Sequence, residues 1–321
     1  MLHKSWLGTA LAVWRRPSRP ARLAAAAIAC AGLLTAFASP AAAQVQTTFQ
    51  IPFTRPEAWA LAHFTAATLL SGLETPATRR PGDVSIGLEL GWLPALTPTE
   101  ELVGFDGIDS LDLNQAPFLP RPRVTIGLPA HFAVIVAAVP PVPMYGLKAA
   151  LLAVGLERPL IEKPRWTFGL RGYGQVGWVR GAYTCPASLL AFPPGSPQNM
   201  MGCDSTSSDT ASLRYVGGEA SVAYRTEASS RFSPHASIGI NDMDVGFQVD
   251  ALTFGYLDHT HYVSHGTAVS VSGGLSYRLA SRFTLGVDLF YSPLRVRRAP
   301  GAPVQTDGLF NVRALFTYRL R

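Results

Sequence analysis

The sequence predicts an all-β protein: an antiparallel transmembrane β-barrel of about ten strands, preceded by one N-terminal helix. Apolar and polar residues alternate along successive segments, most clearly over 267–291, as they do in strands with two different faces. No stretch after Gln44 is long and apolar enough for a spanning helix, so membrane insertion would have to use strands. Expected connections alternate between long and short, as in outer-membrane barrels.

The hairpin over 267–291 shows the pattern best. One parity holds aliphatic residues with tyrosines near its ends, and the other holds small, hydroxylated or charged residues. The first face suits lipid and the second suits a wet lumen. Eight or twelve strands, and a soluble periplasmic β-sandwich, are the alternatives that this pattern leaves open.

Residues 1–43 are expected to form a cleaved secretory signal peptide. Five basic residues precede an apolar run over 23–37, and three alanines then offer a cleavage site before Gln44. The run is shorter than the roughly 20 residues of a spanning helix, which argues against an uncleaved anchor. Lipidation at Cys30 is disfavoured because the apolar run continues past it. The expected location is the cell outer membrane of a Gram-negative bacterium.

Removing the signal changes the charge balance. The chain has 27 Lys and Arg against 21 Asp and Glu, and the five charges of the signal are all basic, which leaves 22 against 21. A near-neutral mature chain gives no reason to expect a nucleic-acid partner. Of the three cysteines, only Cys185 and Cys203 remain, and a single pair in an exported protein predicts a disulfide.

The segment 44–82 is expected to be a periplasmic lead-in that contains one helix over 55–72. Residues 54–57 have the pattern of a capping box with proline in the first turn, and Gly72 marks the end. An apolar stripe on this helix must be buried. The helix could plug the lumen, cap the periplasmic mouth or lie on the inner leaflet, and packing on the barrel for stability is the favoured interpretation.

The barrel is expected over 83–321. Its strands are predicted, in chain order, at 83–93, 123–128, 132–138, 145–157, 165–180, 213–225, 232–249, 267–279, 283–291 and 309–320. The segment 145–157 is the least clearly patterned. Within 232–249 the apolar parity switches at Asn241–Asp242, which predicts a β-bulge there.

The last strand carries a family resemblance. Asn311 is followed by Phe316 and Tyr318, two aromatics spaced by one residue. This resembles the C-terminal assembly signal of Gram-negative outer-membrane barrels, although Arg313 stands where that signal has glycine and the chain ends in Arg321. The resemblance implies two partners, the barrel-assembly machinery and outer-membrane lipid.

Charged residues occupy the parity that would face the lumen. The candidate lumen charges are Glu89, Arg171, Arg225, Arg278, Asp288 and Arg313, and the same face adds Arg123, Lys148, Arg165, Glu219, His235 and Arg319. They could pair with one another and fill a narrow barrel, since buried charge must be paired. Alternatively, the excess of arginine could form a constriction that favours anions.

Histidines in one long loop are weak candidates for chemistry. His259, His261 and His265 could bind a transition metal. By spacing alone, Asp and His near Asp106 and Asp109 also resemble the rim sites of ten-stranded surface proteases. Solvated loop histidines are the favoured interpretation, so no catalytic residue, metal or cofactor is expected.

These observations favour a narrow channel for small solutes, or a structural or surface-interaction barrel. The alternative is an outer-membrane hydrolase with a rim site in the long loops. The sequence identifies no solute.

Overall fold

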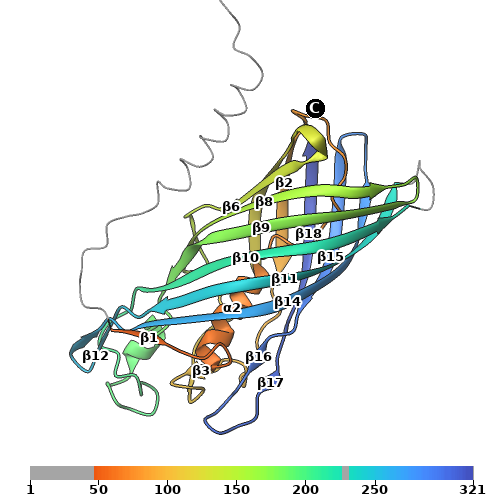
Figure 1. The fold of residues 1–321 in the computed structure, drawn as a ribbon. Helices are drawn as coiled ribbons and strands as arrows, with labels where there is room; N and C mark the ends of the chain where they lie inside the picture. The colour runs from red at the N-terminus through yellow and green to blue at the C-terminus, as the bar shows by residue number, and fades with distance from the viewer. Residues whose placement is uncertain (1–46, 226–230, 321) are drawn as a thin grey trace, which may run out of the picture. The chain divides into compact units, whose positions relative to one another are not determined.

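The computed structural model describes residues 47–225 and 231–320 (Figure 1). This part of the chain forms a closed antiparallel barrel of ten strands around one helix, which confirms the predicted fold class. The predicted signal peptide, 1–43, lies outside the described residues.

The barrel wall follows the order of the chain. Its strands are β2 (Val84–Trp92), β5 (Phe118–Gly127), β6 (Ala133–Val139), β8 (Leu147–Glu162), β9 (Trp166–Gly181), β10 (Asp209–Tyr224), β11 (Phe232–Gln248), β14 (His261–Arg278), β15 (Phe283–Ser292) and β18 (Leu309–Arg319). Each pairs with its neighbour in this list, and β18 closes the barrel on β2, where Val312 lies opposite Trp92. Because β18 pairs with β2, the wall has no terminal strand of the kind that an open sheet has.

The two ends of the barrel differ. Few residues separate β5, β8, β10 and β14 from the next strand of the wall, and we call this the short-turn end. The other connections form the long-loop end, which carries most of the minor elements. They are β3 (Leu102–Gly104), β4 (Asp109–Ser110), β7 (Pro143–Met144), η2 (Ala187–Ala191), β12 (Ala251–Thr253), β13 (Tyr256–Asp258), β16 (Arg295–Val296) and β17 (Gln305–Thr306), while η1 (Pro129–His131) forms a short turn.

The N-terminal segment runs through the barrel. Strand β1 (Thr48–Gln50) pairs in parallel with the first residues of β14, at the long-loop end. Helix α2 (Pro56–Ala67) follows, enclosed by the wall (Figure 1). The chain reaches the short-turn end where the Gly82 amide donates to the Gly127 carbonyl, just before β2. Within the expected lead-in, residues 47–82 thus start at the long-loop end and pass through the lumen to the short-turn end.

Helix α2 is shorter than the predicted 55–72, and the capping box does not form. Its N-cap is Arg55, with no side-chain cap, and Glu57 instead accepts a hydrogen bond from the Arg55 guanidinium. Ten of its twelve residues are buried, so the helix is covered on nearly every face. A helix with one buried stripe would fit a sheet surface, whereas burial all round fits the inside of a barrel. The structure thus has the helix in the lumen.

The described residues contain no helix of the length and apolar character needed to cross a membrane.

The wall changes character along its length. Nearer the short-turn end, Val216, Ile240 and Val269 point outward with exposed fractions of 62%, 61% and 40%, which is the apolar band that outer-membrane barrels present to lipid. Nearer the long-loop end the pattern inverts, with apolar side chains buried inside and charged ones outside. The inner set includes Leu213, Met243 and Val245, and the outer set includes Arg214, Asp242, Asp244 and His265.

This inversion replaces the predicted β-bulge. The pairing of β11 with β14 continues without a register shift through Asn241, Asp242 and Met243. The bulge prediction is wrong because the strand keeps its alternation while its surroundings change. The apolar residues after Asn241 face an apolar interior.

Candidate functional site

A belt of buried charge crosses the lumen. Its side chains come from seven wall strands and from the N-terminal segment, and all are largely shielded from solvent. They are Glu74, Glu89, Arg121, Arg123, Glu157, Arg171, Glu219, Asp288 and Arg313. Four arginines thus face five carboxylates. The belt is close to neutral, which favours the predicted mutual pairing over an anion-selective constriction.

Arg171 is at the centre of this belt. Its guanidinium lies 2.8 Å from a Glu157 carboxylate oxygen and 2.6 Å from one of Glu219. The same group donates to the backbone carbonyls of Gly72, at 3.1 Å, and Glu74, at 3.0 Å. One arginine therefore joins two wall strands to the N-terminal segment.

Two further arginines hold the segment just after α2. Arg121 pairs with Glu89 at 2.6 Å and donates to the Thr68 and Leu69 carbonyls. Arg313 donates to the Leu69 carbonyl at 3.1 Å. The next amide, that of Leu70, donates to the Tyr215 hydroxyl at 3.1 Å instead of to a helix carbonyl, so contacts with the wall also account for the end of the helix near Thr68.

Carboxylates of the belt hold the amides of the same segment. Gly72 donates to Glu219 at 2.8 Å and Leu73 donates to Asp288 at 3.1 Å. Gly72 and Leu73 both have positive φ, so the backbone turns here in a conformation that favours glycine. We call residues 68–74 the plug segment, because its backbone fills the lumen at the level of the belt.

Four of the candidate lumen charges, Glu89, Arg171, Asp288 and Arg313, lie in this belt. Arg225 and Arg278 instead lie at the short-turn end, where β10 and β14 finish.

Three members were missed. Arg121 shares its parity with Arg123 but sits between two prolines, beyond the predicted strand. Glu157 closes a segment with a weak pattern, and Glu74 lies in the supposed lead-in.

An apolar cavity of about 450 Å³ lies between α2 and the wall, on the long-loop side of the belt. Its lining is mostly aliphatic, aromatic and methionine side chains. The helix contributes Ala60, Leu61, Phe64 and Ala67, and the wall contributes Leu119, Val139, Ala149, Leu151, Val179, Ala211, Leu213 and Phe247. Pockets that hold small organic molecules have this size range and this apolar character.

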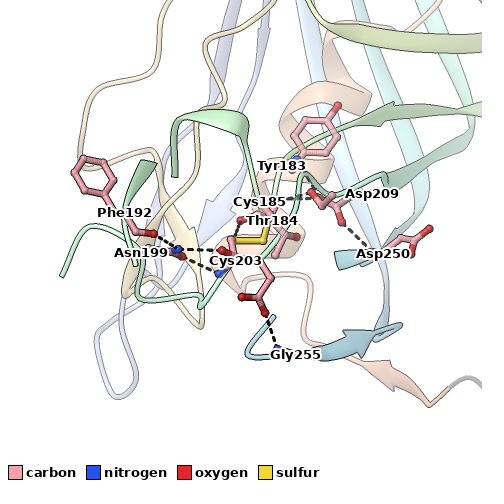
Figure 2. The surroundings of a disulfide bond; sticks show 11 residues. Tyr183, Thr184, Cys185, Phe192, Asn199, Cys203, Asp209, Asp250 and Gly255 are labelled. Atoms are coloured by element: carbon pink, nitrogen blue, oxygen red, sulfur yellow. Dashed lines mark hydrogen bonds between the residues drawn. A yellow bond between two sulfur atoms is a disulfide. The ribbon is translucent and has the colours of Figure 1, made fainter. Parts of the chain in front are cut away.

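Loops form the roof of the cavity, and the predicted disulfide is part of it. Figure 2 shows the Cys185–Cys203 bond, which confirms the prediction. The Asn199 side chain accepts from the Cys203 amide at 2.8 Å and donates to the Cys203 carbonyl. Met200 and Met201, between the two cysteines, line the cavity. The disulfide therefore fixes the loop that supplies part of the cavity lining.

Asp209 ties the same loop to the wall. One carboxylate oxygen accepts from the Tyr183 and Thr184 amides, at 3.0 and 2.7 Å, and the other accepts from the Asp250 amide at 2.9 Å (Figure 2). Two long loops thus meet on one buried side chain at the start of β10. This contact holds the roof in register with the wall.

Polar residues at the start of α2 complete the roof. Arg55 lies between Glu57, at 3.0 Å, and Asp106, at 3.3 Å. Burial disfavours the guanidinium charge, but the hydrogen bond and charge of Glu57 outweigh it and hold the Arg55 pKa above its ordinary value. Trp59 donates to the Asp307 carbonyl at 2.7 Å, which fixes the helix to the loop after β15.

The loop histidines are not brought together. His259 lies 3.6 Å from Asp250, His265 lies 3.3 Å from Asp242, and the His261 ring lies 3.4 Å from the Thr48 hydroxyl. In the parts of the chain that the structure describes, no three His, Cys, Asp or Glu side chains form a group that could hold a metal. Within the same parts, none of these rings forms an ion pair with Asp106 or Asp109.

The residues of the expected assembly signal lie on both faces of β18. Asn311 is fully buried on the inner face. Phe316 and Tyr318 pack around Phe283 on the outer face, with ring centroids 5.6 and 4.7 Å away. The strand that carries them also closes the barrel.

No family model matches this chain, and no curated protein matches it. Among solved structures it is similar to Ail, the attachment invasion locus protein of Yersinia pestis, with 12% identity, a TM-score of 0.26, and coverage of 74% of this chain and 100% of that one. It is also similar to the outer membrane protease OmpT from Escherichia coli, with 11% identity, a TM-score of 0.34, and coverage of 77% and 98%. For the Pseudomonas putida toluene transporter TodX the values are 12%, 0.35, 85% and 78%. These proteins share the outer-membrane β-barrel class, and at such identities and TM-scores the likeness carries no argument about function.

Proposed function

We propose that this barrel binds a small apolar molecule in the cavity beside α2 and carries it into the outer membrane. The single observation behind this proposal is the inverted wall. At the level of the belt the wall strands point charged side chains into the lumen. On the long-loop side of the belt, wall strands point aliphatic and aromatic side chains into the lumen, around a cavity of about 450 Å³. An interior built for water or ions would keep polar residues along its whole length.

The belt argues against an open pore for polar solutes. The backbone of the plug segment occupies the lumen, and buried arginines and carboxylates bind both its carbonyls and its amides. Ten strands enclose a narrow lumen compared with the 16 to 18 strands of open porins. The protein in a planar bilayer should therefore show no stable ion conductance.

The preferred ligand is a compact hydrocarbon or aromatic molecule. The lining offers large apolar surfaces from Phe64, Phe247 and Leu213, with polar groups confined to the roof and floor. Burying apolar surface contributes about 25 cal/mol per Å², so an aromatic molecule of two rings gains several kcal/mol without any ion pair.

Binding can be tested with N-phenyl-1-naphthylamine, an apolar fluorescent amine. The protein in lipid nanodiscs should raise its fluorescence saturably above that of empty nanodiscs. Ala211→Phe fills the cavity and should weaken the affinity about tenfold, which corresponds to about 1.4 kcal/mol.

The matched control is Ala220→Phe, on the same strand but facing outward. It should bind as the unchanged protein does. A titration that never saturates, or an equal loss in both variants, would remove the cavity from consideration.

The proposed location needs its own test. Export by a cleaved signal, insertion into outer-membrane lipid and recognition of β18 by the assembly machinery are parts of the proposal. A folded, heat-modifiable band in outer-membrane fractions would support them. A protein extracted without detergent would contradict them. The loop histidines give the hydrolase alternative no support, because in the described residues none of them forms an ion pair with Asp106 or Asp109.

A further inference from the structure

The wall has a gap in its pairing between β5 and β6. The two strands pair from Gly127 with Ala133 as far as Arg123 with Ala137. Both strands continue beyond this point toward the long-loop end, to Phe118 on one side and Val139 on the other. Within the described residues no further pair joins them. We call this stretch, 118–122 against 138–142, the seam.

Prolines explain the gap. The Leu93 amide donates to the Pro117 carbonyl and the Gly127 amide donates to the Asp83 carbonyl, so odd-numbered residues of β5 bond toward β2. Its even-numbered residues must then bond toward β6, as the Leu128 amide does with the Phe132 carbonyl.

The missing amides belong to the positions that would bond between β5 and β6. If the register continued, Pro122 would face Ala138 and Pro120 would face Pro140. Three of the four amides that these two pairs need do not exist, because proline has no N–H. The next amide, that of Val142, donates to the Pro140 carbonyl in the same connection after β6. The two edges therefore cannot close through ordinary pairing.

The cavity reaches both edges of the seam. Leu119 and Val139 line it from the inward face. Phe118 and Val142, which also line it, are 47% and 54% exposed. One cavity is thus bordered by residues on the inside and by residues on the outside of the wall at the same place.

The seam lies at the outer edge of the apolar band. The register places Val139 opposite Leu151 and Pro143 opposite Lys148. On the next strand the outward Trp178 lies opposite Ala150, and the outward Arg180 lies opposite Lys148. An aromatic residue followed by cations is the usual order at a membrane interface. The seam therefore spans the level between lipid tails and headgroups.

We propose that the seam is a lateral port, through which small apolar molecules pass between the cavity and the hydrocarbon of the outer leaflet. This rests on the proposed function, since it gives the cavity a direct route into the membrane. It also suits the blocked lumen, because an apolar molecule need not cross the charged belt to leave. The exposed rim of the port is itself apolar, formed by Phe118 and Val142.

The port can be tested with a phospholipid that carries a maleimide on its acyl chain. Ala149→Cys places a thiol in the cavity, and Ala220→Cys places one on the outer face of β10. With the seam intact, both should react with the lipid-borne maleimide. N-ethylmaleimide, added from water, should also label Ala149→Cys through the long-loop end.

Restoring the amides should shut the port. Pro120→Val, Pro122→Thr and Pro140→Thr together return the three missing donors. In this triple variant, labelling of Ala149→Cys by the lipid-borne maleimide should fall at least about tenfold. Labelling of Ala149→Cys by N-ethylmaleimide should not change. Labelling of Ala220→Cys by the lipid-borne maleimide should not change either. The double variant Pro120→Val with Pro140→Thr serves if the triple variant loses its heat-modifiable band.

Two outcomes would overturn the port. One is that, with all three prolines present, the lipid-borne maleimide labels Ala220→Cys but does not label Ala149→Cys. The other is undiminished labelling of Ala149→Cys after the amides are restored. A failure of N-phenyl-1-naphthylamine to bind would instead count against the proposed ligand class and leave the labelling result standing.

Discussion

At the residue scale, the lumen is closed by side chains that serve two partners at once. Arg171 neutralises Glu157 and Glu219, and it also donates to carbonyls of the plug segment. A buried charge is tolerated only when it is paired, so each of these groups depends on the others. Loss of one should loosen the plug as well as the wall.

Arg171→Met should therefore destabilise the barrel by about 3–5 kcal/mol, because it leaves two carboxylates buried without a cation. Urea unfolding in detergent, followed by tryptophan fluorescence, would measure the change. The same variant should conduct ions in a planar bilayer where the unchanged protein does not. A loss under about 1 kcal/mol with a silent bilayer would show that the belt does not hold the plug.

Gly72→Ala tests the same contact with a change in the backbone of the plug segment. Gly72 has φ +71°, and a methyl group there would collide with Asp288, Arg313 and Ser272. Gly301→Ala is a matched control, since Gly301 has φ +78° but open space around it. Both variants carry about 1–2 kcal/mol of backbone strain. Only Gly72→Ala should open ion conductance, and equal behaviour of the two would mean that the collision is absorbed without moving the plug.

At the element scale, the sequence shows which strands form but not what surrounds them. Period-two patterning predicts ten strands and the long-loop alternation, because each strand faces two different media. This patterning misleads at Asn241. Before Asn241 the apolar residues of β11 face outward, and after it they face the apolar interior. The resulting switch of parity suggests a β-bulge that β11 does not contain. That switch is the sequence signal of the cavity.

The N-terminal helix shows a second limit. Its residues predict a helix to Gly72, because helix propensity and the apolar stripe extend that far. The structure ends it at Ala67, because the Leu70 and Gly72 amides donate to side chains of β10, far along the chain, instead of to helix carbonyls. Such long-range contacts leave no local pattern in the sequence.

The roof loop gives a prediction at the same scale. Replacing both Cys185 and Cys203 with Ser opens a loop with a sequence separation of 18, and the chain-entropy model expects a loss of about 3 kcal/mol. Because this loop can open while the strands stay paired, protease cleavage within 186–202 should accelerate while the barrel keeps its heat-modifiable migration. Unchanged cleavage would show that Asn199 and Asp209 hold the loop without the disulfide.

At the scale of the whole molecule, three features point to one behaviour. The charged belt blocks water and ions, the cavity above it suits an apolar molecule, and the seam joins the cavity to the level of the lipid. A barrel with these features would move apolar molecules sideways into the membrane, whereas a porin moves polar molecules along its axis.

The most direct test of the central claim is a crystal of the protein soaked with 1-bromonaphthalene, with the bromine located by anomalous scattering. We expect a bromine peak inside the barrel between Phe64, Leu213 and Phe247, and its loss in Ala211→Phe crystals. Bromine found only among detergent on the outer face, with none in the cavity at saturating concentration, would contradict the account.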